Sequence, residues 1–121
     1  EISYLQSEAY AAGELKHGTI SLIEEGTPVI AVATQDALFE KTLGNIKEVR
    51  ARGARVIALV SEDNTEIRSL VDYVIPVPQT DAMLKPSLDV IPLQLFAYYM
   101  ALERGCDVDK PRNLAKSVTV E

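Results

Sequence analysis

The sequence has few of the residues that metal sites and disulfides require. It contains one cysteine, one histidine and no tryptophan. A single cysteine cannot close an internal disulfide and suits a reducing compartment, so we expect a cytoplasmic protein. Cys106 and His17 are far apart in the sequence, which argues against a zinc site, and we expect neither a metal nor another cofactor. We interpret Cys106, which follows Gly105, as a packing residue.

Long apolar runs and an excess of positive charge are also missing. No unbroken apolar stretch approaches the roughly 20 residues that a membrane-spanning helix needs. No charged-then-apolar leader opens the chain, so we expect no signal peptide. Twelve basic and eighteen acidic side chains give a net charge of −6, which argues against nucleic acid or an anionic membrane as a partner. Any phosphorylated ligand would have to be neutralised by local groups.

The length and composition predict one globular domain. With 121 residues, 47% of them hydrophobic, the chain can bury a core but is too short for two ordinary domains. Residue 1 is glutamate and not methionine, so we expect the chain to be an excised part of a longer protein.

Three short β-rich runs alternate with helical patterns. Thr27–Ala33 and Arg55–Val60 are nearly all apolar, as in strands that are covered on both faces. Tyr73–Val77 is a third run, and its Pro76 is typical of an edge strand or a strand end. The alternation predicts an α/β fold, a three-layer αβα sandwich around a parallel sheet with right-handed crossovers. Either a short strand at Ser21–Ile23 or a sheet shared with a missing half would bring the strand number to its usual value.

The segments between these runs show helical spacing. We expect a helix over residues 35–52, capped by Thr34 and stopped by Gly53. Its apolar face would consist of Leu38, Thr42, Ile46 and Val49. Asn64 or Thr65 is expected to cap a short helix before the third strand.

Two further helices are expected near the ends of the chain. The last, about Ile91 to Glu103, is apolar on most faces, would have Pro92 in its first turn and would end at Gly105. A helix at the start of the chain would place four residues on one narrow face: Glu1, Leu5, Glu8 and Ala12. Two carboxylates there fit a general base with a helper, and they fit the solvated end of a helix equally well.

The loop after the first strand lies where ligands gather in open parallel sheets, beyond the carboxyl ends of the strands. This loop, Ala33–Asp36, holds one hydroxyl and no glycine, and its aspartate would repel phosphate. We therefore interpret it as a plain helix cap and expect no phosphate cradle in this chain.

Two ionisable groups stand in irregular surroundings. His17 precedes Gly18 where the helical pattern breaks, so it is free either to reach a ligand or simply to face water. Lys116 lies in the tail Pro111–Glu121, which is too short and too Pro-interrupted for a core helix. Its amine fits a solvated surface lysine or, if a nearby cation or burial keeps it neutral, a nucleophile that forms a Schiff base with a ketone.

Three strings together resemble one family. They are Glu-Ile-Ser-Tyr at residues 1–4, Gly-Glu-Leu-Lys-His-Gly at residues 13–18, and the tail at residues 111–121. They resemble the glutamine:fructose-6-phosphate amidotransferases, also called glucosamine-6-phosphate synthases, and the likeness runs along the whole chain. Members of that family join a glutamine-hydrolysing domain to an isomerase region made of two sugar-isomerase (SIS) halves. The resemblance implies a flavodoxin-like second SIS domain at residues 1–105, followed by a C-terminal catalytic tail at residues 106–121.

The resemblance also implies a reaction and the residues that perform it. Fructose 6-phosphate and ammonia from glutamine would give glucosamine 6-phosphate, the first step of hexosamine synthesis. Glu1 corresponds to the base that moves a proton between C1 and C2 of the sugar. His17 corresponds to a histidine that assists ring opening in the neighbouring subunit's site, and Lys116 to a lysine that engages the sugar carbonyl as a Schiff base. Glu1, Ala115 and Lys116 would contact the substrate.

Several parts of the family's machinery fall outside this chain. A further family lysine would lie just before Glu1, and the hydroxyl-rich loop that holds the sugar phosphate belongs to the first SIS half. The glutaminase cysteine belongs to the glutaminase domain, and Cys106 is not its equivalent. We therefore expect the first SIS half, the glutaminase domain and a second copy in a homodimer as partners. The isolated chain is expected to be inactive.

Two other functions compete with this one. A non-catalytic SIS module could bind a sugar phosphate to regulate transcription or a kinase, but the lysine-bearing tail and the Gly-Glu-Leu-Lys-His-Gly string argue against it. A receiver-like or purely structural domain is the other alternative. A receiver needs a phosphorylatable aspartate at a strand end. Thr34 and Ser61 occupy those positions here, although Glu62 and Asp63 follow the second strand.

Overall fold

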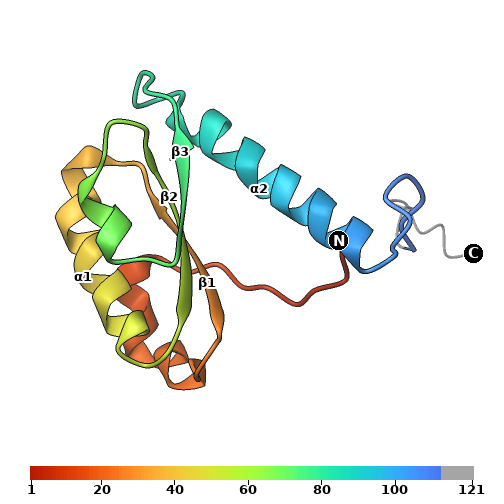
Figure 1. Ribbon diagram of the computed structural model, residues 1–121, viewed down its shortest axis with the longest axis horizontal. Coiled ribbons are helices and arrows are strands. Elements are labelled where there is room, and N and C mark those ends of the chain that lie inside the picture. Colours follow the sequence, from red (N-terminus) through yellow and green to blue (C-terminus); the bar gives the residue numbers. More distant parts are fainter. Residues whose placement is uncertain (113–121) are drawn as a thin grey trace, which may run out of the picture. The chain divides into compact units, whose positions relative to one another are not determined.

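A computed structural model describes residues 1–112 of the chain (Figure 1). The described residues form two compact units, one made of residues 9–89 and one made of residues 1–8 together with residues 90–112. None of the helices within residues 1–112 is long and apolar enough to cross a membrane.

The centre of the larger unit is a parallel sheet of three strands in the order β1-β2-β3 (Figure 1). The strands are β1 (Pro28–Ala33), β2 (Arg55–Ser61) and β3 (Tyr73–Val77), which confirms the three predicted runs to within one residue at each end. Pro28 pairs with Arg55 at the start of the sheet, and Ser61 pairs with Val77 at its end. The central strand is the most deeply buried, as expected of an apolar strand with a neighbour on each side. Its buried apolar residues are Val56, Ala58, Leu59 and Val60.

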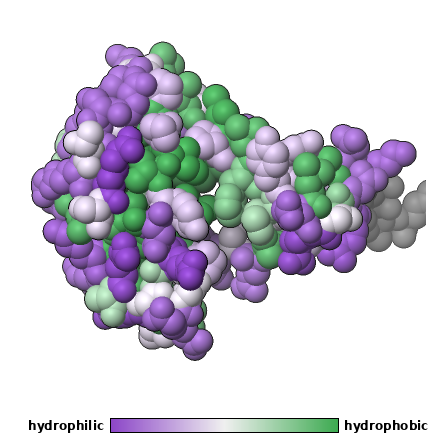
Figure 2. All heavy atoms as spheres, in the orientation of Figure 1, coloured by the Kyte–Doolittle hydropathy of each residue, from purple (hydrophilic) through white to green (hydrophobic). Residues whose placement is uncertain are grey.

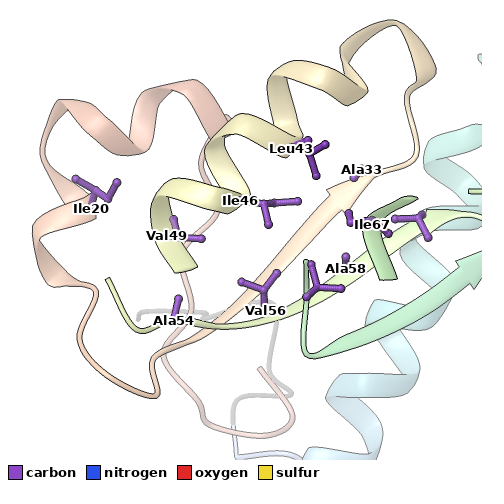
Figure 3. Packing of buried hydrophobic residues seen from close by; sticks show 11 residues of the cluster. Ile20, Ala33, Leu43, Ile46, Val49, Ala54, Val56, Ala58 and Ile67 are labelled. Carbon is purple, nitrogen blue, oxygen red and sulfur yellow. The ribbon is translucent and has the colours of Figure 1, made fainter. Parts of the chain in front are cut away.

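Helix α1 (Phe39–Arg50) covers one face of the sheet and follows a short 3-10 turn, η3 (Asp36–Leu38). Figure 3 shows its apolar side chains pointing toward the sheet. Its buried residues are Leu43, Ile46 and Val49. Full burial of each such side chain stabilises the fold by roughly 1.5–3 kcal/mol. The predicted face was right at Ile46 and Val49 and wrong at Leu38, which is exposed, because the α-helix begins only after the 3-10 turn.

The outer face of α1 is polar, as the amphipathic pattern of this helix requires. Figure 2 shows hydrophilic residues over the side of the larger unit where α1 lies, with apolar residues gathered over the sheet.

A short 3-10 helix, η4 (Glu66–Ser69), connects β2 to β3, and its Ile67 is completely buried. The Ile67 N–H donates to Asn64 Oδ1 at 3.4 Å, and Thr65 makes no side-chain cap, so Asn64 is the capping residue of the two candidates.

Helix α2 (Lys85–Glu103) begins six residues earlier than predicted. The carbonyl of Asp81 accepts the N–H groups of Leu84 and Lys85, and Pro86 suits the first turn because a helix leaves the N–H at that position unpaired. Pro92 therefore lies in the helix interior, and its predicted place in the first turn is wrong.

The predicted end of α2 is confirmed by its capping bonds. Gly105 has a φ of 67°, its N–H donates to the Leu102 carbonyl at 2.9 Å, and the Cys106 N–H donates to the Ala101 carbonyl at 2.9 Å. These two bonds are those of a Schellman motif, in which a glycine takes the left-handed conformation.

The predicted N-terminal helix is wrong, and of the two alternatives for a further strand, the one at Ser21–Ile23 is wrong as well. Residues 1–11 form no helix or strand, and two 3-10 helices follow: η1 (Ala12–His17) and η2 (Thr19–Leu22), the second occupying most of the expected strand Ser21–Ile23. Tyr4 has a φ of 53°, which is incompatible with a right-handed helix. Glu1, Leu5, Glu8 and Ala12 therefore do not share a helical face.

Gly53 makes the turn between α1 and β2. Its φ is 92°, its N–H donates to the Arg50 carbonyl at 2.9 Å, and its own carbonyl accepts the Gly26 N–H at 2.8 Å. A Cβ at this position would lie 2.8 Å from Glu25 Cα and would also collide with the Glu25 carboxylate. The predicted stop at Gly53 is confirmed, and the position requires glycine both for its conformation and for its close neighbour.

Gly53→Ala is expected to lower the free energy of unfolding by about 1–3 kcal/mol, because alanine is strained at this φ and its Cβ clashes with backbone. Gly44→Ala is the matched control. Gly44 lies within α1, where an added Cβ would meet nothing within 4 Å, so alanine there is expected to raise stability by up to about 1 kcal/mol. Urea unfolding measures both changes. Equal effects of the two substitutions would contradict this account of the turn.

Candidate functional site

The residues that the sequence singled out for catalysis lie in different parts of the chain. Glu1 is exposed in the smaller unit, at the start of the irregular segment. His17 is exposed in the larger unit, at the last position of η1. Ala115 and Lys116 lie outside the described residues. The roles predicted for these four residues therefore stay predictions.

The local packing explains why His17 faces outward. Leu15 packs against the core of the larger unit, and Ile20 is buried in it. The Gly18 N–H donates to the Leu15 carbonyl at 3.4 Å, which turns the chain between these two anchors. The two anchors face inward, and Lys16 and His17, which lie between them, are exposed. His17 is thus presented on a short segment that is held at both ends.

A polar cluster at the carboxyl edge of the sheet, buried except for the exposed Gln79, was not predicted. We call it the carboxyl-edge cluster, and it consists of Thr34, Ser61, Gln79, Lys85 and Asp89. Thr34 directly follows β1 and Ser61 ends β2, while Lys85 and Asp89 lie one turn apart on α2. The cluster therefore joins the ends of two strands to the first turns of a helix.

Hydroxyl groups link the two buried charges of this cluster. Lys85 Nζ donates to Ser61 Oγ and to Gln79 Oε1, both at 3.1 Å. Ser61 Oγ donates to the Thr34 carbonyl at 3.3 Å, and Thr34 Oγ1 donates to Asp89 Oδ2 at 2.6 Å. The second oxygen of Asp89, Oδ1, is buried and has no hydrogen-bond partner among the described residues.

The burial of these groups makes their hydrogen bonds necessary. Lys85 is 6% exposed, Asp89 is 9% exposed and Thr34 is fully buried. A buried charge is costly unless it is hydrogen-bonded or paired, so the hydroxyls of Thr34 and Ser61 stabilise an arrangement that apolar residues could not. The short Thr34–Asp89 bond is of the stronger, charge-assisted kind.

The predicted role of Thr34 as a helix cap is wrong. Gln35 precedes η3 and no side chain caps this turn, because the Thr34 hydroxyl is bonded to Asp89 instead. Lys85 and Asp89 were missed because the helix was predicted to begin at Ile91. Two signals would have found them: Asp81 followed by Pro86 is typical of a helix start, and Lys85 and Asp89 have the i, i+4 spacing of one helical face.

The cluster determines what this edge of the sheet can do. Its one ammonium group is already bonded to Ser61 and Gln79, and its one carboxylate would repel a phosphate. A phosphate at this edge would have to displace internal hydrogen bonds.

An open depression of about 450 Å³ lies at the opposite edge of the sheet, among residues at the starts of β2 and β3. Gly53, Arg55 and Asp72 contribute to its lining. No group of three or more metal-binding side chains occurs within residues 1–112.

Thr34→Val is expected to lower the free energy of unfolding by about 1–3 kcal/mol, because the isosteric valine leaves the buried Asp89 carboxylate without its donor. Thr42→Val is the matched control. Thr42 is half-buried in α1 and outside the cluster, so the same substitution there is expected to change stability by less than about 0.5 kcal/mol. Urea unfolding compares the two variants. Equal losses would show that the Thr34 hydroxyl adds nothing to the fold.

The chain is similar to known proteins along its whole length. The SIS domain family model matches residues 1–104. The glutamine–fructose-6-phosphate aminotransferase [isomerizing] of Caldanaerobacter subterraneus subsp. tengcongensis is 66% identical over 121 residues, which are all of this chain and 20% of that protein. The proteins of the same name from Clostridium tetani and Methanosarcina acetivorans are 62% and 60% identical over the same share. The chain thus spans about a fifth of the length of the curated relatives that it matches.

A solved structure supports the same placement. The C-terminal domain of glucosamine-fructose-6-phosphate aminotransferase from Francisella tularensis superposes with a TM-score of 0.80 at 39% identity, covering 92% of this chain and 32% of that chain. This likeness confirms the predicted α/β sandwich. Because the family model covers almost the whole chain and the parallel sheet with flanking helices is the expected fold, the chain belongs to the SIS domain family.

Proposed function

We propose that this chain is the second SIS half, with its C-terminal tail, of the isomerase region of a glucosamine-6-phosphate synthase. The enzyme would convert fructose 6-phosphate and ammonia from glutamine to glucosamine 6-phosphate and water. The observation that carries the proposal is the 66% identity, over all 121 residues, to an aminotransferase named for this reaction. Residues 1–105 would be the SIS domain, and residues 106–121 the catalytic tail.

The proposed partners follow from what this chain leaves to other parts of the enzyme. The carboxyl-edge cluster offers no free cation or glycine-rich loop for a sugar phosphate, so we assign phosphate binding to the first SIS half. Ammonia would come from the glutaminase domain of the same polypeptide. The exposed His17 is available to a second subunit, which fits a homodimer. We place the enzyme in the cytoplasm, because a single cysteine suits a reducing compartment. Without these partners the isolated chain would be inactive.

The proposed roles divide the reaction among three side chains. The Lys116 amine would condense with the C2 carbonyl of open-chain fructose 6-phosphate to give a Schiff base and water, and ammonia would then displace the lysine. Glu1 would take a proton from C1 of the resulting imine and return it to C2, while the C1 hydroxyl proton passes to the imine nitrogen, which leaves an amine at C2 and an aldehyde at C1. His17 would open the sugar ring by proton transfer, and Ala115 would contact the substrate beside Lys116.

The second candidate function is a non-catalytic SIS module that binds a sugar phosphate. Such a module needs its own phosphate site, and the edge where a parallel sheet usually supplies one is occupied here by buried hydrogen bonds. This observation favours the enzyme over the regulatory module.

The proposal is tested in a full-length chimera, in which these 121 residues replace the matching fifth of the Caldanaerobacter enzyme. Glu1→Gln and His17→Ala are each expected to lower kcat roughly 100-fold to 10,000-fold, the usual contribution of a general acid or base. Lys116→Ala is expected to lower it at least as much, because the covalent step is lost. The measurement is the rate of glucosamine 6-phosphate formation from fructose 6-phosphate and glutamine.

The matched controls are neighbouring residues of the same charge type. Glu14→Gln, Lys16→Ala and Lys110→Ala change exposed side chains that are close to His17 or Lys116 in the sequence, and their rates are expected to stay within about twofold of the parent. Parent-like synthesis by all three catalytic-site variants would show that the chain is a scaffold and that the proposed roles are wrong.

A further inference from the structure

Tyr4 has an unusual backbone conformation. Within residues 1–112 it is the one non-glycine residue with a positive φ, 53°. The left-handed region costs an ordinary residue roughly 1–2 kcal/mol, so it persists only where surrounding contacts hold it. Tyr4 lies three residues after Glu1, the base of the proposed reaction.

Arg112 makes two separate contacts with this tyrosine. Its guanidinium carbon lies 3.7 Å from the centroid of the Tyr4 ring, which is a cation–π contact. Its backbone N–H donates to the Tyr4 hydroxyl at 2.7 Å. The preceding residue, Pro111, is buried and fixes the chain direction at this point. We call the two contacts together the Tyr4–Arg112 clasp.

The clasp joins the two segments that carry proposed catalytic groups. Both of its residues belong to the same compact unit, although 108 positions separate them in the sequence. Lys116 comes four residues after Arg112, so chain geometry limits its Cα to about 14 Å from that of Arg112. The clasp therefore fixes the residue from which the lysine-bearing segment continues, next to the segment that carries Glu1.

Resting on the proposed function, we propose that Tyr4 and Arg112 are positioning residues, and that their clasp holds the tail so that Lys116 and Glu1 act on the same sugar. Neither residue needs to touch the substrate for this role. Positioning a nucleophile converts a search into an intramolecular step, which affects the chemical step more than substrate binding. The clasp should therefore act on kcat and leave KM for fructose 6-phosphate nearly unchanged.

The two contacts can be removed separately in the full-length chimera. Tyr4→Phe removes the hydroxyl bond and keeps the ring, while Arg112→Ala removes the guanidinium and keeps the backbone N–H. Each is expected to lower kcat about two- to tenfold, with KM within about twofold. Tyr4→Leu removes both contacts, and its kcat is expected to be lower than that of Tyr4→Phe or of Arg112→Ala. In the Tyr4→Leu background, Arg112→Ala is expected to have no further effect, because its ring partner is already gone. Arg112→Lys, which keeps a cation over the ring, is expected to recover part of the loss.

A second readout follows the lysine directly. Borohydride reduces the Schiff base between the Lys116 amine and the C2 carbonyl to a stable secondary amine, and mass spectrometry of the tail peptide measures the adduct. Across the Tyr4 and Arg112 variants, the rate of adduct formation is expected to fall in the same order as kcat falls. The controls are Tyr99→Phe and Arg104→Ala, two exposed side chains of the same types near the end of the chain, and both are expected to trap substrate like the parent.

The outcomes separate this inference from the proposed function. If the parent chimera traps no adduct and Lys116→Ala stays active, the proposed role of Lys116 is wrong. If the parent traps the adduct and the Tyr4 and Arg112 variants do so at the same rate, the clasp does not position the lysine. Losses confined to KM, or an undiminished effect of Arg112→Ala in the Tyr4→Leu background, would overturn the clasp as well. Tyr4→Phe keeps the side-chain volume, so it tests the inference even if Tyr4→Leu fails to fold.

Discussion

The hydrogen bond from Thr34 to Asp89, 2.6 Å long and buried, joins the end of β1 to the second turn of α2. Through Ser61 and Lys85 the same network reaches the end of β2, so the two strands and the helix are tied together at one edge of the sheet. Both charges are buried, and each depends on hydroxyl groups for its hydrogen bonds. A ligand that entered this edge would have to displace hydrogen bonds of this network.

In most open parallel sheets the carboxyl edge is the place where ligands bind. Here that edge is used for internal bonds, and no residue with a proposed catalytic role belongs to the carboxyl-edge cluster: Glu1 is in the irregular N-terminal segment, His17 ends a 3-10 helix, and Lys116 is outside the described residues. Such an arrangement suits a half-domain that contributes side chains to a site whose phosphate cradle belongs to another part of the enzyme. The Tyr4–Arg112 clasp fits the same view, because it fastens the base of the tail to the segment that follows Glu1.

The sequence predicted the sheet well because strands buried on both faces are continuous apolar runs, as at Arg55–Val60. Gly53 and Gly105 were also predicted, since both stops need a residue that tolerates a positive φ. The predicted N-terminal helix is wrong because helical periodicity cannot reveal the positive φ of Tyr4, whose hydroxyl accepts a hydrogen bond from a residue 108 positions away. The carboxyl-edge cluster was not predicted, because the sequence around Thr34 is typical of a helix cap. Only tertiary packing brings Asp89 beside it. The irregular tail drew attention to Lys116 but left two interpretations open, and only the family resemblance favoured a catalytic role, which stays a prediction.

The central claim is that the sugar binds away from the carboxyl-edge cluster of this chain. A crystal structure of the full-length chimera with fructose 6-phosphate bound tests it most directly. The account predicts that the sugar lies beside Glu1 and Lys116, that its phosphate is held by the first SIS half, and that the Thr34–Asp89 hydrogen bond is intact. A phosphate group bound among Thr34, Ser61 and Lys85, with that hydrogen bond broken, would contradict it.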